Sequence, residues 1–431
     1  MSVNPPAIPG GRGCHALNMC KEKRSFAHSG LRPAPLRNGE IDLEIRSIVP
    51  SEYEKTRNIQ TVAFGSKNDP AAQPKSGSHR TYRAVFEQGK ACACLESFPL
   101  RAFLGGRQVG MSGIGGVATL PEERHKGYIR SLFRYTLEES RGNGDGLSYL
   151  FPFSHLFYRR FGYESCMVKN RVSIPLSAFP PTVPGGRAAL YEPGDDPADI
   201  RALYDRFAEG INLMTLRSEE KWSELLALDP YVTRQYLYVW HGASGAPLGY
   251  VRFAPQDEGS DKDLVASELI WASPEGLRGL LGFLGGFTAQ YRRFVYRAPE
   301  FLNFRLMIGE PYAVESRAEC TGMGRVVDAG RVLETLGAPA DGDAVVFRVH
   351  DDFLEWNDGT FALYADGGRA RVEPARRSPS VETDVRTLAQ LVAGYVSAED
   401  CLLAGTAEFT GDFARLSRLF PKRRVYIADE F

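Results

Sequence analysis

The stretch from Gly113 to Tyr163 constrains the fold of this chain more than any other part of its sequence. It opens with the apolar run GIGGVATL (113–120), which predicts a buried strand with glycines where another backbone could come close. Pro121 ends this strand. After a short basic turn, apolar residues recur with the spacing of an amphipathic helix, at Ile129, Leu132, Phe133 and Leu137.

The basic turn has the features of an anion-binding site. Helix N-termini carry unpaired N–H groups and partial positive charge, so a pyrophosphate fits there. Arg124, His125 and Lys126 add side-chain donors, and Gly127 lets a phosphate approach the backbone without a Cβ in the way. Taken alone, Gly127 also fits an ordinary turn glycine, and His125 fits an exposed donor with no special role.

A second strand and a short aromatic helix complete the stretch. GNGDG (142–146) closes the first helix, residues 147–153 predict the next strand, and residues 154–163 predict a short helix running into a turn. The predicted order is therefore strand, phosphate turn, helix, strand and aromatic helix.

These motifs carry a resemblance to a known superfamily. RHKGYI (124–129) resembles the Arg/Gln-x-x-Gly-x-Gly/Ala acetyl-CoA loop of the GNAT N-acetyltransferases, and FYRRFGY (157–163) resembles their later Phe-Tyr-x-x-Phe-Gly-Phe/Tyr signature. Ile129 stands where most of the superfamily has Gly or Ala. In this respect the loop resembles the Eis (enhanced intracellular survival) branch, which reads Arg-x-x-Gly-hydrophobic-hydrophobic.

The resemblance implies a mixed α/β, or α+β, architecture. It consists of tandem GNAT-like domains followed by a sterol-carrier-protein-like C-terminal domain. The implied segments are a flexible N-terminal extension (1–40), a catalytic GNAT domain (41–172), a second GNAT-like domain without the cofactor loop (173–316), and a sterol-carrier-like domain with a catalytic C-terminus (317–431).

The hydrophobic pattern outside the organising stretch predicts the remaining elements of the first two domains. The expected elements are a strand at 41–46, a helix at 53–64, a polar loop at 68–78 and strands at 82–86, 91–98 and 100–109. A Pro- and Gly-rich linker is expected at 175–197, before the second α/β unit.

The resemblance also implies a set of acetyl-CoA-binding residues. The pantetheine arm is expected between two splayed strands, where it would pair with the backbone of Val117, Ala118 and Thr119. The remaining expected cofactor residues are Arg124, His125, Lys126, Gly127, Tyr128, Ile129 and Ser154.

Two catalytic residues are expected from the same resemblance. Tyr158 would donate a proton to the departing thiolate, because a phenol stays protonated at neutral pH. The α-carboxylate of Phe431 would accept the proton of the amine, and Asp429 and Glu430 would add negative potential that attracts a polycation. Without the motif, Tyr158 would read as a core aromatic.

Composition excludes several other classes of function. With 52 Lys and Arg against 53 Asp and Glu, the net charge of −1 offers no electrostatic case for nucleic acid. The cysteines form no Cys-x-x-Cys pair and the histidines no His-Glu-x-x-His pattern, so no metal is predicted and Cys92 and Cys94 are expected to be packing residues. No apolar run approaches the roughly 20 residues of a membrane span. A cytoplasmic location without membrane contact is therefore expected.

The leading hypothesis is an acetyl-CoA-dependent N-acetyltransferase that acts on primary amines of a small polyamine-like substrate. By analogy, aminoglycoside antibiotics are the candidate class, and the resemblance implies a homo-oligomer, as the hexamers of the Eis branch. Two alternatives stay open at this point. One is a carrier for an apolar ligand, which would use the third domain, and the other is a regulatory protein that binds acetyl-CoA without turnover.

Overall fold

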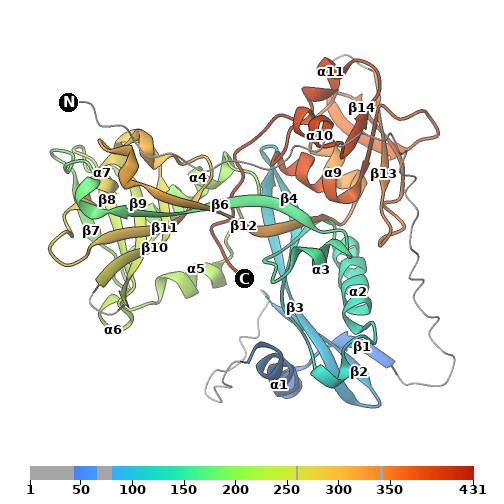
Figure 1. Ribbon diagram of the computed structural model, residues 1–431, viewed down its shortest axis with the longest axis horizontal. Coiled ribbons are helices and arrows are strands. Elements are labelled where there is room, and N and C mark those ends of the chain that lie inside the picture. The colour runs from blue at the N-terminus through green and yellow to red at the C-terminus, as the bar shows by residue number, and fades with distance from the viewer. Residues whose placement is uncertain (1–42, 66–79, 259–260, 340–342) are drawn as a thin grey trace, which may run out of the picture. The chain divides into compact units, whose positions relative to one another are not determined.

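The computed structural model describes residues 43–65, 80–258, 261–339 and 343–431 (Figure 1). The extension predicted for residues 1–40 and the polar loop predicted for residues 68–78 lie outside the described residues. The described residues form a sheet of twelve strands and a sheet of five. Among their helices, none combines the length and the apolar character that crossing a membrane requires.

The first part of the large sheet contains the organising stretch. Its elements are β1 (Leu43–Ser47), α1 (Tyr53–Phe64), β2 (Thr81–Glu87), β3 (Lys90–Leu104), β4 (Arg107–Thr119), α2 (Tyr128–Gly142), β5 (Asp145–Leu150), α3 (His155–Arg159) and β6 (Glu164–Pro175). The predicted order of strand, turn, helix, strand and short helix is confirmed. Leu132, Phe133 and Leu137 form the buried face of α2, as their spacing predicted.

One strand boundary was predicted wrongly. The strands expected at 91–98 and 100–109 are a single strand, β3, and the turn to β4 lies at Gly105 and Gly106. No break occurs between residues 98 and 100, where Pro99 stands; β2 pairs with β3 as far as Ser97, so Pro99 lies beyond that ladder. A proline is tolerated there because its missing N–H is not needed for a strand partner on that side.

The second part of the large sheet repeats this arrangement. Its elements are β7 (Arg187–Leu190), α4 (Ala198–Glu209), α5 (Glu219–Leu226), α6 (Pro230–Thr233), β8 (Tyr236–His241), β9 (Pro247–Glu258), β10 (Asp261–Trp271), α7 (Pro274–Gly285), β11 (Arg293–Pro299) and β12 (Glu315–Val326). The predicted linker at 175–197 is more than a connection, because it contains β7, which pairs with β8. Four residues were too short a run to be distinguished from a loop by pattern.

The order of strands joins the two parts into one sheet. It runs β1-β2-β3-β4-β5-β12-β6-β11-β10-β9-β8-β7. The pairs β4–β5 and β10–β11 are both parallel, and a helix, α2 or α7, connects the strands of each pair. β12, which contains the expected domain boundary at residue 317, lies between β5 and β6.

The remaining elements build the five-stranded sheet, in the order β15-β14-β13-β16-β17. They are α8 (Ala329–Glu334), β13 (Val345–His350), β14 (Gly359–Asp366), β15 (Arg369–Pro374), β16 (Val381–Asp384), α9 (Val385–Ala393), α10 (Ala398–Ala404), β17 (Ala407–Phe409) and α11 (Phe413–Ser417). A buried ion pair ties this domain to the large sheet: Arg325, at the end of β12, donates to Asp351 over 2.6 Å. Asp351 also accepts from the backbone of Phe353 and Leu354.

Removing Asp351 should therefore cost considerable stability. We expect Asp351→Ala to lower the free energy of unfolding by about 3–5 kcal/mol, because it leaves the Arg325 guanidinium buried without its counter-ion. Asp352→Ala is the matched control, since Asp352 is exposed and should change stability little. Urea unfolding followed by circular dichroism measures both, and equal stabilities of the two variants would contradict the assignment.

Candidate active site

The candidate site lies where the pairing between β4 and β5 ends. The parallel ladder runs from Gly110 to Ile114 on β4, opposite Asp145–Leu150. β4 continues to Thr119. Beyond Ile114 it pairs with β3 alone, and a β-bulge interrupts that ladder. The segment expected to bind pantetheine, Val117 to Thr119, thus has a backbone edge with no strand partner among the described residues. An extended ligand can add to such an edge as a strand would.

The N-terminus of α2 suits a pyrophosphate. Gly127, at its N-cap, has φ of 86°, no side chain caps the helix, and its first turn contains no acidic residue. Every other α-helix of the described residues has a capping side chain, an acidic residue in its first turn, or both. The equivalent helix of the second part, α7, is capped by Ser273 and has Glu275 in its first turn. Only the first of the two repeated units is therefore open to an anion here.

The predicted loop residues divide into an exposed and a buried group. Arg124, His125, Lys126 and Gly127 are exposed, and the backbone of His125 is left-handed, with φ of 67°. Tyr128 is buried, and Ile129 packs at the edge of the same apolar cluster as Tyr158. This packing explains a bulky residue where a small one is usual in the superfamily.

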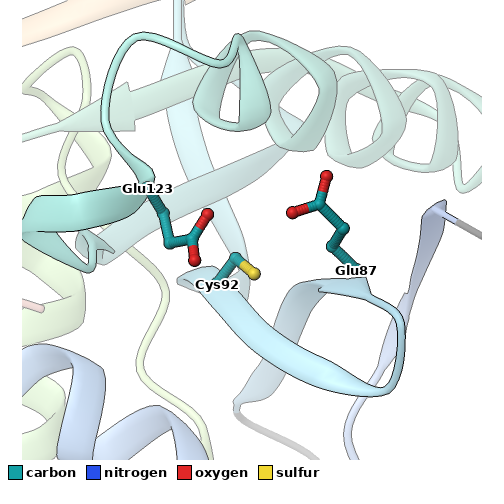
Figure 2. A group of neighbouring side chains, drawn as sticks. All are labelled: Glu87, Cys92 and Glu123. Carbon is teal, nitrogen blue, oxygen red and sulfur yellow. The ribbon is translucent and has the colours of Figure 1, made fainter. Parts of the chain in front are cut away.

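Lys126 is already engaged by the protein. Its ammonium lies 2.6 Å from Glu123 and 3.1 Å from Glu87, and Lys90 binds Glu123 from the other side over 2.9 Å. Figure 2 shows the two carboxylates gathered around the Cys92 thiol. Burial raises the pKa of Cys92, so its thiol stays neutral. A divalent cation would have to displace both lysines, and we interpret the group as the ion-paired support of the loop.

Ser154 supports the helix that carries the expected acid. Its Oγ accepts from the backbone N–H of Phe157 over 3.3 Å and so caps α3. Tyr158 on this helix is only 4% exposed, and Phe133 and Phe153 meet its ring edge-on. Burial raises the pKa of Tyr158, which keeps the phenol protonated at neutral pH.

Phe431 lies against the glycines of β4. Its ring packs on Phe98 and Phe151, with centroids 5.5 and 5.2 Å away. A Cβ on Gly113 would come within 2.6 Å of this ring, and a Cβ on Gly115 would lie 3.6 Å from the Phe431 carboxyl carbon. The close approach expected from the glycine pattern is thus that of the chain's own last residue.

Tyr158 and Phe431 approach β4 from opposite faces. Neighbouring residues of a strand face opposite ways, so Gly113 and Gly115 share one face and Ile114 has the other. Phe431 contacts the two glycines, whereas Ile114 belongs to the apolar cluster of Tyr158. The β4–β5 ladder ends at Ile114. An acyl group held in the opening beyond it can therefore be reached from both faces.

A buried ionic network holds the end of the chain. Asp429 accepts from Arg217 over 2.9 Å and from Thr215 over 2.7 Å, and Arg217 also pairs with Glu268 over 2.6 Å. Tyr426 donates its backbone N–H to Asn212 over 3.0 Å. Asp429 was expected to attract a cationic substrate, and this expectation is wrong because the carboxylate is buried and already paired. No sequence signal linked these residues, which lie some two hundred positions apart.

Three family descriptions match the chain. An acetyltransferase (GNAT) domain family matches residues 44–166, a second acetyltransferase (GNAT) domain family matches residues 213–326, and a sterol carrier protein domain family matches residues 329–428. GNAT acetyltransferases use acetyl-CoA, and the residues fit this co-substrate. The uncapped N-terminus of α2 suits its pyrophosphate, and the unpaired edge of β4 suits its pantetheine amides.

Individual relatives match across most of their length. The chain is 26% identical over 390 residues to an uncharacterized N-acetyltransferase of Streptomyces coelicolor, which covers 85% of this chain and 93% of that relative. It is 25% identical over 320 residues to the N-acetyltransferase Eis of Mycobacterium tuberculosis, and this match covers 72% of this chain and 76% of that relative. Its fold is similar to that of Eis1 from Mycobacterium abscessus, with a TM-score of 0.73 at 21% identity over 90% of this chain and all of that one.

The network at Asp429 predicts a pH-dependent contribution to stability. Burial alone would raise the pKa of Asp429, but the Arg217 guanidinium outweighs this and holds its pKa below the usual value. A carboxylate with a lowered folded-state pKa stabilises the fold above the pKa of the unfolded chain, and this stabilisation is lost as the pH falls through the folded-state pKa.

We therefore expect Asp429→Asn to lower the free energy of unfolding by about 1–3 kcal/mol at neutral pH, with a difference from wild type that shrinks below about pH 4. Urea titrations at several pH values measure this difference. Glu209→Gln is the control, because Glu209 is exposed at the end of α4. A difference that stayed constant down to pH 2 would refute the role of the Asp429 charge.

Proposed function

Because the chain is an Eis-like N-acetyltransferase with two GNAT domains and a C-terminal sterol carrier protein domain, we propose that it acetylates primary amines of a small polyamine-like substrate, such as an aminoglycoside. The acetyl group passes directly from acetyl-CoA to the amine in a ternary complex. The observation that carries this proposal is the position of the Phe431 carboxyl group beside Gly115, at the opening between β4 and β5.

The surroundings of Phe431 support an amine as the acceptor. A cavity of about 150 Å³ adjoins this residue. Its charged lining consists of Arg80, Arg217, Lys221, Glu220, Glu224, Asp429, Glu430 and the carboxylate of Phe431. Asp429 and Arg217 pair with each other, and the other carboxylates of this set outnumber its other cations, which favours a positively charged guest.

Each step of the proposed reaction has a residue to perform it. Acetyl-CoA, when bound, supplies the acetyl thioester. The amine nitrogen forms a bond to the acetyl carbon while the carbon–sulfur bond breaks. The Phe431 carboxylate accepts the proton that the amine loses, Tyr158 donates a proton to the thiolate, and a backbone N–H of Val117 to Thr119 polarises the acetyl oxygen. Holding both reactants in attack geometry can supply roughly 7–11 kcal/mol of the barrier reduction.

The resemblance to the Eis branch extends to assembly and location. We propose a homo-oligomer, with a hexamer as the expected form, acting in the cytoplasm. Large apolar side chains left exposed in the single chain support an interface: Tyr312 is 96% exposed and Leu306 is 83% exposed. Light scattering coupled to size-exclusion chromatography measures the mass in solution.

Release of free thiol from acetyl-CoA tests the catalytic assignment. We expect turnover with amines from a panel of aminoglycosides, polyamines and lysine-containing peptides, falling at least tenfold in Tyr158→Phe and in a variant that lacks Phe431. Acetyl-CoA binding, followed by calorimetry, should persist in both variants. Tyr135→Phe is the matched control, because Tyr135 lies on the exposed face of α2.

Other outcomes would redirect the proposal. Turnover that does not depend on Phe431 would keep the transferase and remove the terminal carboxylate from its mechanism. Acetyl-CoA binding without turnover of any amine would favour the regulatory alternative, and binding of apolar ligands alone would favour the carrier.

A further inference from the structure

A second, larger cavity also borders the C-terminal segment. Its volume is about 490 Å³, and its walls come from β6, β9, β10, β11, α5 and residues 426–430. Six cationic side chains line it: Lys169, Arg171, Arg217, Lys221, Arg252 and Arg297. Three carboxylates oppose them: Glu268, Asp429 and Glu430. The balance of charge is therefore the reverse of that around Phe431.

The carboxylates of this cavity do not neutralise its cations. Arg217 alone occupies two of them, because it pairs with Glu268 over 2.6 Å and with Asp429 over 2.9 Å. Arg297 pairs with Glu319, which is not part of the lining, over 3.1 Å. Glu430 is then the one lining carboxylate left for the other cations.

Lys169 shows this shortage of counter-ions most clearly. Its side chain is only 3% exposed, yet its nearest carboxylate, that of Glu430, is 3.8 Å away on a side chain that is 63% exposed. Its ammonium otherwise lies over the rings of Tyr426 and Phe151, at 5.3 and 5.9 Å. Burying an ammonium without a close counter-ion is costly. Burial accordingly lowers the pKa of Lys169. A bound anion would raise this pKa again.

Arg252 adds a second cation, which hydrogen-bonds a neutral partner and also interacts with the charge of Glu268. It lies on β9 and donates to the amide oxygen of Gln235 over 2.8 Å. Burial lowers its pKa as well. Lys169 and Arg252 thus present donors to the same cavity, and Arg171 adds an exposed guanidinium two residues along β6 from Lys169.

The cavity adjoins the place where acetyl transfer is proposed. It shares Arg217, Lys221, Asp429 and Glu430 with the cavity around Phe431. Glu430 immediately precedes Phe431, so both cavities border the same end of the chain. A molecule that extended from one cavity to the other would meet carboxylates at one end, and Lys169 and Arg252 at the other.

We propose that the acceptor amine also carries an anionic group, a carboxylate or a phosphate, and that Lys169, Arg252 and Arg171 bind this group. The inference rests on the proposed acetyl transfer to a primary amine, and it replaces the aminoglycoside class, which has no anionic group, by amines with a negative charge a few bonds away. The cationic side chains then have a function that stability alone does not give them, since the six cations of the lining outnumber its three carboxylates and the excess positive charges repel each other.

Matched amines that differ by one anionic group test the inference. L-lysine differs from cadaverine by a carboxylate, and glucosamine 6-phosphate differs from glucosamine by a phosphate. We expect kcat/KM to be at least tenfold higher for the anionic member of one pair, and the pair that responds identifies the anion. Lys169→Met should reduce this preference at least fivefold, mainly through KM, and Arg252→Gln should act in the same direction. Arg187→Met is the control, because Arg187 is exposed on β7 and does not line the cavity.

A binding measurement separates this inference from the proposed function. With saturating coenzyme A present to fill the proposed pyrophosphate site at α2, inorganic phosphate or succinate should raise the melting temperature of the wild type, relative to chloride at equal ionic strength, and Lys169→Met should abolish the shift. Such a shift without turnover of any amine would refute the acetyl transfer and keep the anion site. A preference for cadaverine and glucosamine, with no anion-dependent shift, would refute the anion site and keep the transferase.

Discussion

The pairing of Asp429 with Arg217 is the interaction on which the rest of the site depends. It connects the last residues of the chain to the second part of the large sheet, because Arg217 is itself held by Glu268 of β10. Phe431 follows two residues later and lies against β4 of the first part. One buried arginine thereby sets where a terminal carboxyl group stands relative to the opening between β4 and β5. A buried ion pair is costly to desolvate. This one therefore serves to position Phe431 as much as to stabilise the fold.

The two repeated units have diverged at the same structural point. α2 begins without a cap after a glycine-containing turn, whereas α7 begins with a serine cap and an acidic first turn. An anion is favoured at the first helix and opposed at the second. The second unit instead supplies Glu268, Arg252 and much of the wall of the basic cavity. Under the proposed function, the repeat would provide one surface for the coenzyme and another for the acceptor.

Local chemistry could be predicted from the sequence, and long-range placement could not. The periodicity of α2 and the glycines of β4 were visible as patterns. The break expected between residues 98 and 100 was wrong, because whether a proline such as Pro99 fits inside a strand depends on where the neighbouring strand ends, which only the pairing reveals. Arg217 and Lys169 carried no motif, and their importance comes from partners far along the chain. The aromatic motif predicted the helix of Tyr158, but its packing against Phe133 required the fold.

The position of β12 has a consequence for synthesis of the protein. β12 ends at Val326 and completes the edge of β5, which ends at Leu150. During translation the edge of β5 therefore stays unpaired until well over a hundred further residues have been made. At typical elongation rates this takes roughly ten to thirty seconds. An uncovered strand edge is prone to wrong pairing, so the nascent chain has a defined interval in which a chaperone would protect it. The first half acquires its final neighbours only when most of the polypeptide has left the ribosome.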